Sequence, residues 1–157
     1  MRLICGLLFL LLLLPVTGGA SPAGLQEITD LRKMGVETHR AQRPLLLVFT
    51  AEDCPYCEML EEEVLLPMLR SGEYDRLAFI RSLNLDGDRV LDFEGHPVEP
   101  WEFARRYQVS VTPTMVLLDE RGRLLDKPMV GVRTLDFFEA YIAESIQRAN
   151  RRLAAHR

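Results

Sequence analysis

The sequence has few of the residues from which metal centres are built. It contains only three cysteines and three histidines in 157 residues. Tetrahedral zinc needs about four ligands, and no second Cys or His pair with ligand spacing accompanies Cys54 and Cys57. His39 and His96 are isolated in the sequence, where a solvated or singly hydrogen-bonded role is the simpler interpretation. We therefore expect neither a bound metal nor another cofactor.

Positive charge is also in short supply. Nineteen basic residues face 23 acidic ones, for a formal charge of −4. Nucleic-acid binding depends on positive charge that neutralises phosphates, so no nucleic-acid partner is expected. The proportions of hydrophobic and charged residues, 48% and 27%, are ordinary for one globular domain with a single core.

The N-terminus departs from this average composition. Arg2 precedes an almost wholly apolar run over residues 3–14, and small residues follow up to Ala20. This pattern predicts a secretory signal peptide, residues 1–20, with cleavage after Ala20 or alternatively after Ala23. An uncleaved anchor is the alternative, but a membrane span needs about 20 apolar residues and this run is shorter.

Cleavage would leave one domain, residues 21–157, that keeps two cysteines. Cys5 lies within the apolar run and would leave with the signal peptide. In an oxidising compartment Cys54 and Cys57 would ordinarily form a structural disulfide. A bridge across two residues, however, removes little unfolded-state entropy and stabilises poorly. The spacing is better suited to a bridge that opens and closes.

Apolar spacing predicts an α/β sandwich around a mixed central sheet, parallel at first and antiparallel at its end. Pro55 suits the first turn of a helix that leaves the cysteine pair, and Pro67 is expected to kink or end it. Helices are predicted over residues 25–42, beyond Cys57, over 101–107 and from Thr134, with a frayed basic tail over 148–157. Strands are predicted over residues 45–49, 77–83 and 114–118, with a polar excursion over 86–100, a turn at 120–122 and a hairpin partner over 124–130.

The cysteine pair lies where a strand passes into a helix. A thiolate is stabilised at the first residue of a helix by unpaired amides and the helix dipole, and Cys54 takes that position. Cys57, one turn further on, can reach the same sulfur and resolve a mixed disulfide. Cu(I) binding by the two sulfurs with Met59 or Met68 is the alternative from another class. Both methionines follow the apolar helical spacing, which is more simply explained by a place in the core.

Two segments carry a resemblance to a known family. Residues 45–57, Leu-Leu-Leu-Val-Phe-Thr-Ala-Glu-Asp-Cys-Pro-Tyr-Cys, resemble the segment from strand to active site of the thioredoxin superfamily. Residues 103–114, ending in Val-Thr-Pro-Thr, resemble the helix that leads into its cis-proline loop. Within the superfamily, the chain looks most like periplasmic bacterial thioredoxin-like proteins, including those associated with sulfur-oxidation loci.

The resemblance implies a thioredoxin-like fold and a role for each motif residue. Cys54 would be the nucleophile and Cys57 the resolving thiol. A cis bond before Pro113 would expose the Thr112 backbone to an extended substrate peptide. Substrate contacts are thus expected at Thr112, Pro113, Pro55 and Tyr56. The implied protein is a monomeric periplasmic thiol-disulfide oxidoreductase that exchanges disulfides with exported protein thiols and takes electrons from a membrane thiol reductase.

The sequence departs from the family pattern in two places. Val48 stands where thioredoxins proper carry a buried acid that moves protons to and from the resolving thiol, and Glu52 is expected at the rim. The Pro-Tyr dipeptide between the cysteines is that of glutaredoxins. Their proline is preceded by Thr-Val instead of Val111-Thr112, so glutathione is not expected as the dedicated partner.

Six acids surround the pair: Glu52, Asp53, Glu58, Glu61, Glu62 and Glu63. Most belong to the exposed helix face, but the nearest oppose a thiolate at Cys54. A less stabilised thiolate makes the dithiol a better reductant. The sequence therefore favours a reductase or isomerase over a primary oxidant.

Overall fold

The computed structural model describes residues 24–132 and 134–155, so the predicted signal peptide lies outside the described residues. Four strands form the central sheet in the order β2-β1-β5-β6. Their bounds are β1 Leu45–Thr50, β2 Phe79–Asn84, β5 Thr114–Leu118 and β6 Met129–Val130. β1 and β2 are parallel, whereas β1 with β5 and β5 with β6 are antiparallel. The predicted mixed sheet, parallel at first and antiparallel at its end, is confirmed.

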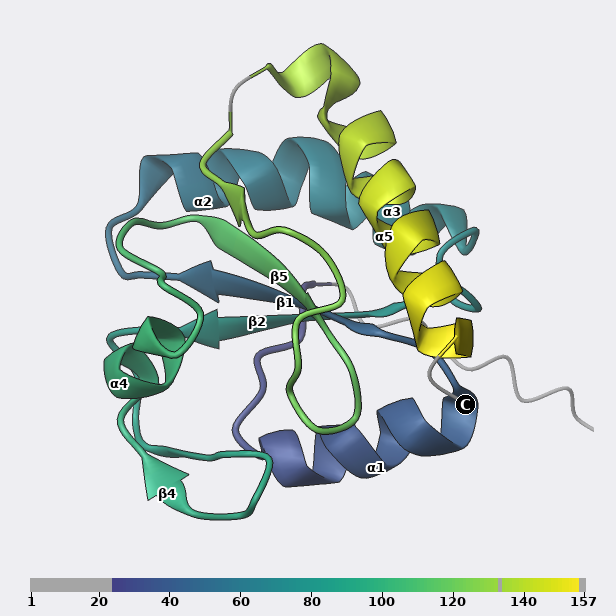
Figure 1. Ribbon diagram of the computed structural model, residues 1–157. Helices are drawn as coiled ribbons and strands as arrows, with labels where there is room; N and C mark the ends of the chain where they lie inside the picture. Colours follow the sequence, from purple (N-terminus) through teal and green to yellow (C-terminus); the bar gives the residue numbers. More distant parts are fainter. Residues whose placement is uncertain (1–23, 133, 156–157) are drawn as a thin grey trace, which may run out of the picture.

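Helices cover both faces of the sheet (Figure 1). One face carries α1 Leu31–Ala41 and α4 Pro100–Arg105. The other carries α2 Pro55–Leu60, the π turn η1 Glu61–Leu65, α3 Leu66–Ser71 and α5 Phe138–Ala155, which the short η2 Leu135–Phe137 precedes. The predicted polar excursion holds a small hairpin of β3 Val90–Leu91 and β4 Pro97–Val98. The α/β sandwich of the prediction is confirmed.

Strand β1 is buried on both of its faces, as its unbroken apolar sequence predicts. Leu45, Leu47 and Phe49 join the core beneath α1 and α4. Leu46 and Val48 join the core beneath α2, α3 and α5. Because side chains on both faces of β1 pack into a core, the position of the strand is fixed. The cysteine segment that follows its carboxyl end therefore lies at a defined place at the edge of the sheet.

The first helix is shorter than predicted, because residues 25–30 are not helical. The Ile28 amide donates to the Ser82 carbonyl at 2.8 Å, and the Ser82 amide donates to the Gln26 carbonyl at 2.9 Å. Asp30 then caps α1 by accepting the Lys33 amide at 2.8 Å. The open edge of β2 satisfies backbone groups of this segment, and the Asp cap sets the start of the helix.

Pro67 does not end the helix that follows the cysteines. The helix continues to Ser71 through the π turn, in which the Leu66 amide donates to the Glu61 carbonyl five residues back. Pro67 has no amide hydrogen to donate, and a wider turn just before it lets the chain remain helical despite that missing bond. The expected disruption is thus confined to one turn.

Residues 148–155 of the expected frayed tail are instead part of α5, which extends to Ala155, and residues 156–157 lie outside the described residues. Leu153 is buried, and the Arg152 guanidinium donates to the Leu125 carbonyl at 2.6 Å. The Arg148 guanidinium donates to Asp126 at 2.8 Å. These bonds tie the helix to residues 124–128, where the predicted strand of residues 124–130 is reduced to one bridge at Leu124 and the two residues of β6.

The Asp126–Arg148 ion pair makes the free energy of unfolding depend on pH in the acid range. Burial alone would raise the pKa of Asp126, but the hydrogen bonds from Arg148, the Lys127 amide and Ser145, together with the charge of Arg148, outweigh it and place the pKa below its ordinary value of 3.8. The unfolded chain then binds this proton more readily, so the stabilisation is present above about pH 4 and lost as the pH falls further. In urea titrations at pH 7 and pH 3, Asp126→Asn should lose less unfolding free energy on acidification than the wild type. The exposed Asp75→Asn should lose as much as the wild type, and an equal loss in all three proteins would contradict the assignment.

Candidate active site

The two cysteines form a disulfide at the start of α2, with their Cα atoms 5.3 Å apart. Cys54 is the N-cap residue, and its carbonyl accepts the amides of Cys57 at 2.9 Å and Glu58 at 3.2 Å. Cys54 is half-buried, whereas Cys57 is 7% exposed. Cys54 is therefore the more accessible of the two sulfurs.

The loop before β5 lies against the sulfur of Cys54. The Thr112–Pro113 peptide bond is cis, as expected. The Thr112 hydroxyl oxygen lies 3.4 Å from the Cys54 Sγ atom, which is within hydrogen-bond reach for sulfur. The Pro113 carbonyl accepts the Gly131 amide at 2.8 Å, so the loop is anchored to the end of β6. Cys54 and Thr112, 58 residues apart in the sequence, thus meet at one edge of the sheet.

The surface beside Cys54 is partly apolar. Pro55 and Tyr56 are both exposed, and Tyr56 shows 61% of its surface to solvent. Val111, which was not among the predicted substrate contacts, is 48% exposed next to Thr112. Asp53 precedes the pair with a φ of 50°, a left-handed conformation that Asp tolerates better than most residues. The exposed apolar side chains are available for contacts with a partner.

A cavity of about 330 Å³ lies on the other side of the pair and is lined by both cysteines. Its carboxylates come from three separate segments and are Glu27, Glu52, Asp53, Glu58 and Glu61. Glu52 is exposed, as the prediction of a rim position requires. The place of Glu27 in this cavity could not be predicted from the sequence, because Glu27 lies 27 residues before Cys54. The pairing of residues 26–28 with β2 brings it to the cavity.

The core beneath the pair is apolar. Val48, at the position of the missing acid, is fully buried and lies between Ser82 of β2 and Met115 of β5 in the sheet register. Met68 is also fully buried in this core, as its spacing predicts, while Met59 is half-buried. Any ionisable partner of Cys57 must therefore come from the cavity side.

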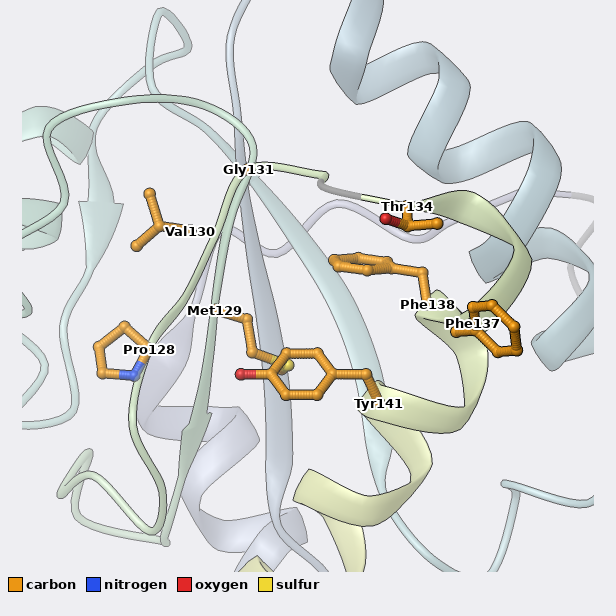
Figure 2. A pocket seen from close by; sticks show the side chains of 8 residues that line it. All are labelled: Pro128, Met129, Val130, Gly131, Thr134, Phe137, Phe138 and Tyr141. Carbon is orange, nitrogen blue, oxygen red and sulfur yellow. The ribbon is translucent and has the colours of Figure 1, made fainter.

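A second, larger hollow of about 450 Å³ lies between β6 and the start of α5. Figure 2 shows Phe138 and Tyr141 projecting from α5 toward Met129 of β6. Phe137, at the rim, is 74% exposed. Neither cysteine lines this hollow, so it is separate from the sulfur pair.

Residues 31–146 match the family model of the thioredoxin-like domain. The chain belongs to the thioredoxin-like family. The structure is similar to a mutant thioredoxin from Halobacterium salinarum NRC-1, with a TM-score of 0.54, 22% identity, and coverage of 82% of this chain and 96% of the other. It is also similar to a poplar thioredoxin h, with a TM-score of 0.54, 20% identity, and coverage of 77% and 96%.

Two curated relatives are methylamine utilization proteins named MauD. The protein from Methylophilus methylotrophus is 36% identical over 100 residues, which cover 58% of this chain and 44% of that protein. The protein from Methylobacillus flagellatus is 33% identical over 106 residues, which cover 58% and 46%. This thioredoxin-like chain therefore spans less than half the length of these curated relatives.

Family, fold and cysteine pair together support an activity of the thiol-disulfide oxidoreductase type. The thioredoxin-like domain presents two cysteines three residues apart, one accessible and one buried, at the start of a helix. Within residues 24–132 and 134–155, no helix combines the length and apolar character that a membrane crossing requires.

The contact between Thr112 and Cys54 can be tested in the reduced protein. A hydroxyl that donates to a thiolate favours the charged form. Thr112→Val keeps the side-chain shape but removes the donor, so alkylation of Cys54 by iodoacetamide at pH 7 should slow by about two- to tenfold, as expected for the loss of one hydrogen bond. Thr134→Val, at an exposed threonine away from the pair, is the control. An unchanged rate in Thr112→Val would show that the hydroxyl does not stabilise the thiolate.

Proposed function

We propose that this protein is an exported thiol-disulfide oxidoreductase that reduces or isomerises disulfides in exported proteins. The observation that carries the proposal is the half-buried Cys54 at a helix start, 3.4 Å from the Thr112 hydroxyl and bridged to the buried Cys57. Export is inferred from the apolar N-terminal run, with residues 1–20 as signal peptide and residues 21–157 as the thioredoxin-like domain acting in the periplasm as a monomer.

In the proposed reaction the Cys54 thiolate attacks one sulfur of a client disulfide. This attack forms a mixed disulfide and releases the other client sulfur as a thiolate, which is protonated. The Cys57 thiolate then attacks Cys54, so the Cys54–Cys57 bond forms and the second client sulfur leaves. The client gains two electrons and the protein loses two, and a membrane thiol reductase would restore the dithiol.

The client chain is proposed to lie across the exposed surface beside the pair. The backbone of Thr112, ahead of the cis bond, offers hydrogen-bonding groups to an extended segment. Pro113 lacks an amide hydrogen, and Pro55 and Tyr56 add exposed apolar contact on the other side of Cys54. These four residues are the proposed substrate-binding set.

The direction of electron flow is inferred from charge. Five carboxylates line the cavity that both cysteines share, and negative charge near a thiolate destabilises it. A less stable dithiolate gives up its electrons more readily, which favours a reductase or isomerase. A reduction potential near about −120 mV, the value of the strong oxidant DsbA, would contradict this direction.

Insulin reduction tests the activity itself. With dithiothreitol as electron source, the reduced protein should accelerate insulin precipitation, and the potential should be measured against glutathione buffers. An acceleration no greater than that of dithiothreitol alone would reject the proposed enzyme. In that case, tight Cu(I) binding by the reduced protein would support a metal-binding module instead.

A further inference from the structure

The resolving step requires Cys57 to lose a proton, and the structure restricts where that proton can go. Only the thiolate is nucleophilic, and Cys57 is 7% exposed. On the core side, Val48 and Leu60 are fully buried and cannot accept a proton. Among the described residues, the cavity of about 330 Å³ that Cys57 lines offers the proton a path to solvent.

Glu61 is the carboxylate placed on the same helix face as Cys57. The two residues are four apart, and the Glu61 amide donates to the Cys57 carbonyl, so their side chains project from one side of the helix. Both line the cavity, and Glu61 is half-buried. The Leu25 amide donates to the Glu61 Oε1 atom at 3.4 Å, which holds the carboxylate on this side.

Glu58 is placed differently. It lies four residues after Cys54, its amide donates to the Cys54 carbonyl at 3.2 Å, and its side chain is exposed. Glu58 therefore follows the accessible cysteine, whereas Glu61 follows the buried one. Each cysteine thus has a carboxylate four residues after it on the same face of the helix. Of these two carboxylates, only that of Glu61, on the face of Cys57, is partly withdrawn from solvent.

We propose that Glu61 accepts the proton of Cys57 in the resolving step, an inference that deepens the proposed function and depends on it. The Cys57 thiol transfers its proton to the Glu61 carboxylate, and the new thiolate attacks the Cys54 sulfur of the mixed disulfide. The Cys54–Cys57 bond forms as the bond to the client breaks. The client sulfur leaves with the electron pair and takes up a proton, and Glu61 returns its own proton to solvent through the cavity.

Because of the other charges around this cavity, the proposal predicts a change in the rate of the resolving step that is opposite to the effect of charge alone. Glu27, Glu52, Asp53 and Glu58 also line it, from the segment beside β2, the turn after β1 and α2, while β2 contributes the neutral Ser82 and Asn84. All the charges are therefore negative, and as charges they oppose a Cys57 thiolate. Removing one carboxylate would speed the resolving step if Glu61 acted only through its charge. The same removal would slow it if Glu61 accepts the proton.

The experiment uses Glu61→Gln with Glu62→Gln as the matched control. Glu62 is the next residue of the same helix, is exposed and does not line the cavity. Reduced protein is mixed with 5,5′-dithiobis(2-nitrobenzoate), and release of thionitrobenzoate is followed at 412 nm by stopped flow. The first release reports attack by Cys54, and the second reports the resolving attack by Cys57 on the adduct.

In Glu61→Gln, the second release should slow about tenfold or more at pH 6–7, and the deficit should close toward pH 9 as hydroxide takes over the proton transfer. The first release should stay within about twofold of the wild type, because Cys54 does not use this carboxylate. Glu61→Asp, which keeps a carboxylate, should recover much of the second phase. Glu62→Gln should match the wild type in both phases.

A second release in Glu61→Gln that equals or exceeds the wild-type rate at every pH would overturn the proposal. The outcome is independent of the client class. If the wild type resolves the adduct but does not reduce insulin, the proposed function fails while the assignment of Glu61 is still tested by the two phases. Unchanged first-phase rates show that the variants are folded around Cys54.

Discussion

Replacing Cys57 with Ser should trap the protein on its natural client. Cys54 would still attack a client disulfide, but no second sulfur could displace the client, so the mixed disulfide would persist. Turnover in insulin reduction should fall to about 1% of wild type or less, in line with the loss of a residue that acts as a unit with its partner. The measurement is recovery of tagged Cys57→Ser from cells that express it, after acid quenching, followed by mass spectrometry of proteins released by dithiothreitol.

The matched control for the trap is Cys54→Ser. This variant keeps Cys57, but Cys57 is 7% exposed and should capture little. It should therefore yield neither turnover nor client. The two variants can be compared by the yield of adducts. If Cys54→Ser gave as many adducts as Cys57→Ser, the assigned order of attack would be wrong.

Phe103→Ala should cost about 3–5 kcal/mol of unfolding free energy, the usual loss for a fully buried aromatic ring. Phe103 is fully buried in α4, and its ring centroid lies 6.4 Å from that of Phe49 and 5.3 Å from that of Tyr107. Natural domains have about 5–15 kcal/mol in total, so this loss is a large share. Guanidinium titration monitored by circular dichroism measures it.

Trp101→Ala on the same helix is the control. Trp101 is the larger side chain but is 39% exposed. Its removal should cost less than about 1.5 kcal/mol of unfolding free energy, because the cavity left behind is smaller and less buried surface is lost. A similar cost for the two variants would mean that α4 is not anchored through Phe103. Because α4 leads into the loop that ends at the cis bond, Phe103→Ala should also slow alkylation of Cys54, whereas Trp101→Ala should not.

Much of the fold could be predicted from local patterns. The apolar run over residues 45–49 and the strand over 114–118 are found as predicted, because a buried strand needs an unbroken apolar sequence. The helix start at Pro55 likewise follows from local chemistry. The errors fall where backbone groups of one segment are satisfied by a distant one, as between residues 26–28 and Ser82, or where Asp126 and Leu125 hold the last turns of α5.

The candidate site likewise has features that could be predicted from local sequence and features that could not. Cys54 and Cys57 are neighbours in sequence, so their pairing and their place at a helix start could be predicted from spacing alone. The family resemblance implied a cis bond before Pro113 and a substrate contact at Thr112, but the contact of the Thr112 hydroxyl with Cys54 was not predicted, since 58 residues separate them. Glu27 in the cavity had no sequence signal, because only the strand pairing brings it there.

The sequence by itself determined most of the strands and helices and the place of the sulfur pair at a helix start, because helix periodicity, strand burial and a two-residue cysteine spacing are local properties. Only the tertiary structure decided which cysteine is buried, which loop touches the more accessible one and which carboxylates surround them. Those relations depend on packing between segments far apart in the chain, and packing distances are not encoded in any single window of residues. The proposed roles of Cys54 as attacker and Glu61 as proton acceptor are argued from that arrangement.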